Sequence, residues 1–242
     1  MTPPTIITLP NKDSSILQNQ YGTGNYTVKL SQSLKFSGEW EVYLLAATIP
    51  YTWYTISNVN NTLLITGAMM PKEVKIPNGN YSDIPTLVDE IQTRFEKIGI
   101  SFSTNHLTMR TTIVIKNGRW LSGPILEILG FKPDAILPPG THISPNISDI
   151  TGRVPSLLIY ISIIENTYIG SIEAPLLATI PIKDSKPGDI IHWKASGPDY
   201  EVHKLKNSSF QTIEIDIRDS KGNSIDFNSH DISIRIGIRK SN

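Results

Sequence analysis

The residues that most often carry metal or acid–base chemistry are histidines, and their spacing is the first test for a site. The five histidines are His106, His142, His192, His203 and His230. No two lie two or four positions apart, so the sequence has neither a His-x-His pair nor a His-Glu-x-x-His helix motif. Isolated histidines of this kind are more typical of solvated loops and strand edges. A site assembled from distant strands is the alternative, but we predict no metal.

Two acid pairs offer the spacing that a glycosidase uses: Glu39 with Glu41, and Glu214 with Asp216. Residues two apart on a strand point to one face, and their carboxyl groups can lie roughly 5–10 Å apart. The same pattern is ordinary on the solvent face of an amphipathic strand. Gly-x-Ser-x-Gly and Gly-Lys-Ser/Thr motifs are absent. Because no group of residues supplies a base, a nucleophile and a stabilising group together, we predict neither an enzyme nor a cofactor.

Three aromatic residues, Tyr51, Trp53 and Tyr54, cluster after Pro50, with Trp40 nearby. Such rings can stack on a sugar in a lectin, or anchor a protein interface. They can equally fill the core at a corner where a strand leaves its sheet. The sequence leaves core and contact surface evenly balanced, with a sugar site less favoured.

The composition argues against nucleic acid and membranes as partners of the chain. Lys and Arg number 22, and so do Asp and Glu, which leaves no net field toward phosphates or anionic lipid. Residues 1–28 hold one basic side chain, Lys12, so there is no basic arm for a nucleic acid. Leu157–Ile164, the longest apolar run, is too short to span a membrane. The absence of cysteine excludes disulfides and suits a reducing compartment.

Alternating isoleucines dominate the C-terminal third. Thr212–Arg218 and Asp231–Arg239 each place isoleucine at every second position, with Glu, Asp, Ser, Arg or Gly between. Period two predicts strands with one row in a core and the other toward solvent or a partner. Ser156–Ile164 is apolar on both faces, which predicts a central strand. Other short strands, Leu63–Thr66 and Glu73–Ile76 among them, complete the set expected for the sandwich.

Only two segments predict helices. Apolar residues recur at spacings of three and four from Ile84 to Phe95, after Ser82 or Asp83 as cap, and Pro124–Leu129 is a shorter candidate. The stretch Pro133–Pro145 is predicted to be a long exposed loop. Many short strands and few helices predict an all-β, antiparallel sandwich, and about eight principal strands favour a jelly roll over an immunoglobulin-type fold.

Several short segments, taken in order, resemble the minor capsid (penton) proteins of Polintons, adintoviruses and virophages. Together they span nearly the whole chain. In order they are Ile6–Pro10 (IITLP), Ser37–Val42 (SGEWEV), Ile49–Thr55 (IPYTWYT), Ile76–Ile91 (IPNGNYSDIPTLVDEI), Ile128–Phe131 (ILGF), Ala174–Leu177 (APLL) and Thr212–Phe227 (TIEIDIRDSKGNSIDF). The chain departs from the family's pattern in having Tyr51 and Ser220 where the family often has His and Asp.

The resemblance implies a single jelly-roll capsid domain over residues 1–242, with a helix-containing insertion around residues 77–150. It implies a homopentamer at the icosahedral fivefold vertices, next to the major capsid protein, in a virion assembled inside the host cell. Candidate subunit-interface residues are Tyr51, Trp53, Tyr54, Arg235 and Arg239. The alternative is a carbohydrate-binding jelly roll that stacks sugars on Trp53 and Tyr54.

Overall fold

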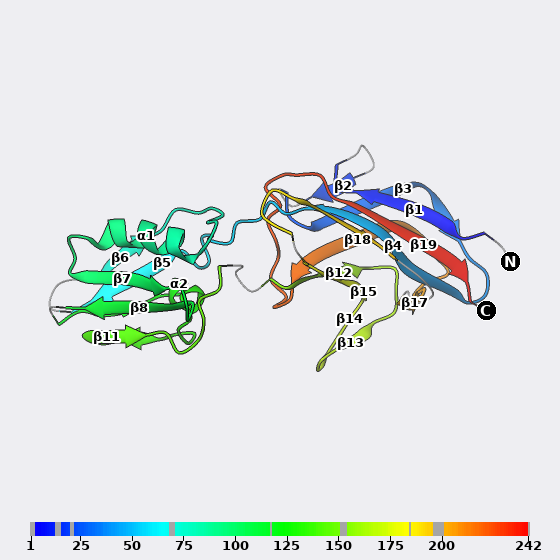
Figure 1. The fold of residues 1–242 in the computed structure, drawn as a ribbon. Helices are drawn as coiled ribbons and strands as arrows, with labels where there is room; N and C mark the ends of the chain where they lie inside the picture. Colours follow the sequence, from blue (N-terminus) through cyan, green and yellow to red (C-terminus); the bar gives the residue numbers. More distant parts are fainter. Residues whose placement is uncertain are drawn as a thin grey trace. The chain divides into compact units, whose positions relative to one another are not determined.

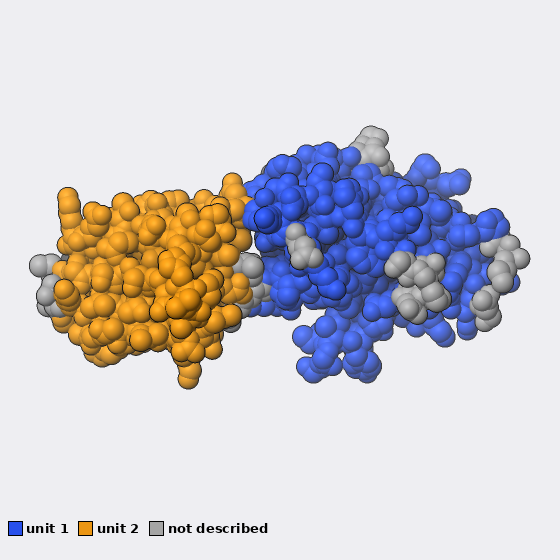
Figure 2. Space-filling view, viewed as in Figure 1, with its two compact units in different colours: residues 1–53, 154–242 blue, residues 54–153 orange. Residues whose placement is uncertain are grey.

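The protein is described by a computed structural model that covers residues 3–12, 16–19, 22–67, 71–116, 118–150, 154–183, 185–195 and 201–241. The chain divides into two compact units (Figure 2). Unit 1 comprises residues 1–53 and 154–242, and unit 2 comprises residues 54–153. Each unit has a hydrophobic core of its own. Within the described ranges, no helix is long and apolar enough to cross a bilayer.

Unit 1 consists of strands (Figure 1). In chain order they are β1 (Thr5–Pro10), β2 (Ile16–Asn19), β3 (Asn25–Lys35), β4 (Trp40–Pro50), β12 (Ser156–Ile161), β13 (Thr167–Ile169), β14 (Ile172–Ala174), β15 (Leu176–Pro181), β16 (Ile190–Lys194), β17 (Val202–Lys204), β18 (Ser209–Asp219) and β19 (Ser233–Lys240). The predicted C-terminal strands are confirmed as β18 and β19. The predicted central strand is confirmed as β12, which lies between β15 and β18.

The strand order of unit 1 is that of a jelly roll. The first sheet has the order β1-β19-β4-β16, with β17 also paired to β4, and the second has the order β15-β12-β18-β3-β2. Every pairing between these strands is antiparallel. The principal strands pass from one sheet to the other at each connection except that from β12 to β15. The all-β, single jelly-roll fold predicted from the sequence is therefore confirmed.

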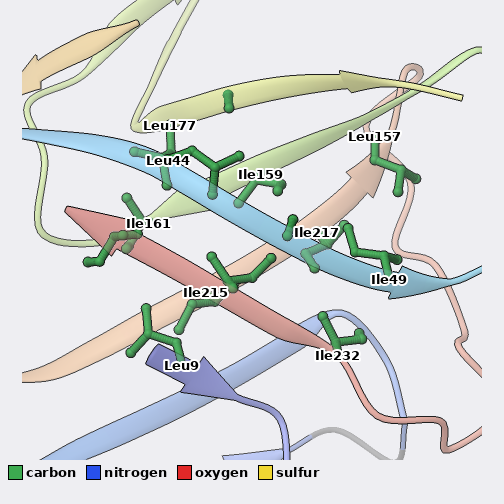
Figure 3. Close-up of a cluster of buried hydrophobic side chains, with 14 of the residues drawn as sticks. Leu9, Leu44, Ile49, Leu157, Ile159, Ile161, Leu177, Ile215, Ile217 and Ile232 are labelled. Atoms are coloured by element: carbon green, nitrogen blue, oxygen red, sulfur yellow. The ribbon is translucent and has the colours of Figure 1, made fainter. Parts of the chain in front are cut away.

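The core of unit 1 lies between the two sheets, where the isoleucine rows meet (Figure 3). Ile215 and Ile217 of β18 face the core from the second sheet, while Ile234 and Ile236 of β19 face it from the first. All four are at most 1% exposed. Burying each such side chain contributes roughly 1.5–3 kcal/mol, so these rows hold the sandwich closed.

A buried tyrosine adds a polar link between the sheets. Tyr26 of β3 is fully buried, and its hydroxyl donates a hydrogen bond of 2.9 Å to the carbonyl oxygen of Leu9 in β1. A buried hydroxyl without a partner would be costly, so this bond allows a large aromatic ring to lie inside the core. Burial raises the pKa of Tyr26 far above its usual value.

Unit 2 lies in the connection between β4 and β12 and contains both helices (Figure 1). Its elements are β5 (Thr62–Thr66), β6 (Lys72–Lys75), α1 (Ile84–Phe95), β7 (Ile100–Asn105), β8 (Arg110–Ile115), β9 (Trp120–Ser122), α2 (Ile125–Ile128), β10 (Ile136–Leu137) and β11 (Gly140–Ile143). They form two small antiparallel sheets, β10-β9-β5-β6 and β11-β8-β7.

The helix α1 begins and ends where its sequence predicts. The Asp83 side chain caps the first turn by accepting a hydrogen bond of 2.8 Å from the Thr86 backbone N–H. Pro85 lies in the first turn, where its missing N–H costs nothing. The five apolar residues at spacings of three and four are all buried. Gly99, at φ +73°, then turns the chain into β7.

The structure differs from the sequence expectations in two places within residues 54–153. The strands expected at Leu63–Thr66 and Glu73–Ile76 pair with each other and with β9, not with the jelly roll, because alternation shows that a strand is half-buried but not which sheet it joins. Pro133–Pro145 was wrongly predicted to lack regular structure, since β10 and β11 lie within it. These short strands pair with β9 and β8, on either side of Pro138 and Pro139.

Candidate subunit interface

Tyr51 and Trp53 are part of the core of unit 1. Their rings stack with centroids 4.1 Å apart, and Trp53 meets Phe227 edge-on at 5.7 Å. Only 5% of Tyr51 and 6% of Trp53 are exposed. Of the two roles left open by the sequence, the structure thus places both rings in the core. Tyr54, the first residue of unit 2, is 47% exposed.

Arg235 and Arg239 lie on β19 and point away from the core, because they alternate with buried isoleucines. The Arg239 Nε donates a hydrogen bond of 3.0 Å to Glu41 Oε2 on β4. The Arg239 guanidinium also lies 5.6 Å from the centroid of the Tyr43 ring. Arg235 is exposed and makes no ion pair with any described residue.

A short apolar row crosses this side of the first sheet. The strand register places Ile6 of β1 opposite Gly237 of β19, Gly237 opposite Tyr43 of β4, and Tyr43 opposite Val202 of β17. Residues opposite one another on antiparallel strands lie on one face of the sheet. Ile6 and Val202 are 50% and 40% exposed.

Gly237 is what lets the Tyr43 ring lie on this sheet. A Cβ atom at position 237 would lie 2.3 Å from Tyr43 Cζ, closer than any real contact. The ring therefore covers the strand at the glycine, and only 7% of Tyr43 is exposed even though it points away from the core.

Basic side chains flank the apolar row. Lys194 of β16 shares a row with Arg235 through Ala46, and Lys204 of β17 lies opposite Glu41. Both lysines are exposed, and neither has an ion-pair partner among the described residues. We call this surface the outer face of the first sheet, and it comprises Ile6, Tyr43, Lys194, Val202, Lys204, Arg235 and Arg239 together with Glu41. Its charge is predominantly positive.

Several of the acids and histidines considered for catalysis make contacts with neighbouring parts of the chain. Glu41 pairs with Arg239, and Asp216 pairs with Arg218 at 2.7 Å. His142 and His203 make hydrogen bonds of 2.7 and 3.0 Å to the carbonyl oxygens of Pro138 and Leu177. No group of three or more His, Asp or Glu side chains able to hold a metal ion occurs in the described part of the chain.

Sequence reasoning missed the aromatic part of the outer face. Tyr43 stands in a run of apolar residues, Val42–Leu45, where alternation is hidden, and β4 bulges near Leu45 against β19. The signal that was present is Gly237, which interrupts an otherwise regular row of bulky residues in the last strand. A glycine inside a strand often marks the close approach of another group.

Nearly the whole chain can be superposed on the solved structure of a penton protein. It matches the crystal structure of the mavirus penton protein with a TM-score of 0.54 and 9% identity, over 98% of this chain and 100% of that one. The chain has the fold of a virophage-type penton protein. A chain in the cryo-EM structure of the Sputnik virophage matches with a TM-score of 0.51 and 11% identity, over 99% and 98% of the two chains.

Sequence comparison adds no relative. No family model matches the chain, and no curated protein matches it. The similarity therefore lies in the fold over nearly the full length of the chains, at an identity too low to carry over single residues.

Proposed function

We propose that this chain is a structural protein of a viral capsid, namely a penton subunit that forms a closed ring of five at the icosahedral fivefold vertices. The observation that carries the proposal is the full-length similarity to the mavirus penton protein, which extends over both units and not over the jelly roll alone. Jelly rolls also serve other functions, so the match over the whole chain counts for more than the fold class.

The outer face of the first sheet is the surface that we propose to contact a neighbouring subunit. Arg235 and Arg239 belong to it. It combines an apolar row with basic groups, of which Lys194, Lys204 and Arg235 have no ion-pair partner among the described residues. In a closed cyclic ring each subunit uses two different surfaces, one toward each neighbour. A specific contact of this kind buries above roughly 1,000 Å² in total. We propose Tyr54, the exposed member of the aromatic cluster, as a further contact residue.

The remaining partners follow from a vertex position. We propose that the ring is held in the shell by the major capsid protein, and that the particle is assembled inside the host cell. The chain is not proposed to bind nucleic acid, because its 22 basic and 22 acidic residues balance and residues 1–28 hold one basic side chain. The sugar-binding alternative is less favoured, because the Trp53 ring is buried against Tyr51 and Phe227 and does not offer its face to a sugar.

Light scattering coupled to size-exclusion chromatography tests the proposal on the purified chain. We expect a species with five times the 26.9 kDa mass of one chain. The measurement should be made over a range of salt concentrations, because charge pairs at the edge of an interface weaken as salt rises. A monomer at every salt and protein concentration would contradict the proposal.

A further inference from the structure

A short hairpin, β13–β14, projects from the body of unit 1 (Figure 1). Its two strands have three residues each, and among the described residues they pair only with each other. Gly170, at φ +61°, begins the two-residue turn between them, as tight hairpin turns require. A two-stranded ribbon of this size is at best marginally stable in water, so a ribbon that projects without a third strand suits contact with another protein.

The two faces of this ribbon carry different side chains. The register pairs Tyr168 with Glu173, which places both on one face, and pairs Ile169 with Ile172 on the other. Tyr168 is 77% exposed, an unusual exposure for a large aromatic side chain. A hydrogen bond joins its side chain to Glu173 and raises the pKa of the Tyr168 hydroxyl. The register thus places an aromatic ring and a carboxylate side by side on one face of the ribbon.

The charge of the hairpin is opposite to that of the outer face of the first sheet. From residue 165 to residue 174 the only charged side chains are the exposed Glu165 and Glu173. The outer face offers Lys194, Lys204 and Arg235 without ion-pair partners among the described residues. Each surface also carries exposed apolar groups: Tyr168 on the hairpin, and Ile6 with Val202 on the face.

We propose that the Tyr168–Glu173 face of the hairpin docks on the outer face of the first sheet of a second copy of this chain. Tyr168 packs on the apolar row of Ile6 and Val202, and Glu173 lies toward Arg235. The inference rests on the proposed ring, and it names the two unlike surfaces that such a ring needs. Since the hairpin and the sheet face are different parts of one subunit, the contact can repeat from copy to copy until the ring closes.

The test measures the protein concentration at which rings of the full-length chain half-dissociate, by sedimentation equilibrium. Tyr168→Ser is expected to raise this concentration about 30-fold or more, as for a central aromatic contact. Ile172→Ser is the matched control, because this exposed residue lies on the opposite face of the same hairpin. Ile172→Ser should change the half-dissociation concentration by no more than about threefold, which corresponds to well under 1 kcal/mol.

A charge exchange makes the test specific to the proposed pair of surfaces. Glu173→Arg and Arg235→Glu should each weaken the ring, and the two together should restore at least half of the lost affinity, because opposite charges again face each other. All four positions are exposed or on the surface of the unit, so thermal melting should confirm unchanged folding.

The outcomes separate the inference from the function on which it rests. If the unaltered chain forms no ring, the proposed function fails and the hairpin contact falls with it. If the unaltered chain forms rings of five and Tyr168→Ser forms them equally well, only the hairpin inference is overturned. Weakening by Ile172→Ser as strong as that by Tyr168→Ser, or the absence of rescue in the charge exchange, would overturn it as well.

Discussion

At the scale of single residues, the clearest energetic statement concerns the buried phenol of Tyr26. Its hydrogen bond to the Leu9 carbonyl joins β3 and β1, which belong to different sheets. We expect Tyr26→Phe to lower the free energy of unfolding by about 0.5–1.5 kcal/mol, the usual net value of such a bond. Urea titration at neutral pH measures it. Tyr81→Phe is the control, because Tyr81 makes a similar bond of 3.0 Å to Pro77 in an exposed setting and should matter less.

The pH dependence of Tyr26 has a definite sign. Burial raises the pKa of Tyr26 in the folded chain above that in the unfolded chain. The stability that comes from keeping this group protonated is therefore complete below about pH 10, the ordinary tyrosine value, and is lost as the pH rises beyond it. Above pH 10 the unaltered chain should lose stability more steeply than Tyr26→Phe. Parallel curves for the two proteins would contradict this account.

At the scale of elements, the start of α1 depends on Asp83. Hydrogen bonds from the side chain and then the backbone of Thr86 lower the pKa of the Asp83 carboxyl group. The stability that the ionised cap provides is present above the pKa of the unfolded chain and is lost as the pH falls through the lower, folded value. We expect Asp83→Ala to lower the melting temperature and Asp83→Asn to retain most of it, since asparagine caps helices equally well.

Melting temperatures at acid pH test whether the ionised Asp83 carboxylate is what stabilises the start of α1. The melting temperature of Asp83→Asn should fall less than that of the unaltered chain between about pH 5 and pH 3, because the amide does not titrate there. If Asp83→Ala melts like the unaltered chain, then the cap does not hold the helix start.

Elements with regular periodicity could be predicted from the sequence, and those that depend on partners could not. The isoleucine rows of β18 and β19 alternate without interruption, so their core faces were evident. The helix α1 was equally clear from its cap and spacing. By contrast, β10 has two residues and gains its order from pairing with β9, which no local pattern reveals.

The candidate interface was predictable only in part, for the same reason. Arg235 and Arg239 followed from alternation along β19, but Tyr43 depends on its contact with Gly237 from a distant part of the chain. Tyr51 and Trp53 follow a strand at a corner, where no period decides between core and surface. The hairpin β13–β14 is too short for its exposure to be inferred from its residues.

At the scale of the molecule, residues 54–153 have the core of a domain of their own. Among the described residues, twenty-one buried apolar side chains form it, and all of them lie from Ile56 to Leu137. We propose that these residues fold when expressed alone, and circular dichroism should then show a cooperative thermal transition. Ile91→Ala, which empties a fully buried position, should destabilise this fragment by about 2–5 kcal/mol. A fragment that shows no cooperative transition would contradict the proposal.

The central claim about the whole molecule is that its two unlike surfaces close a ring of five. Electron microscopy of the purified, full-length chain in negative stain tests this claim most directly, because class averages report symmetry without a mass standard. The account predicts rings with fivefold symmetry at low salt. Isolated single subunits throughout, or rings of any other symmetry, would contradict it.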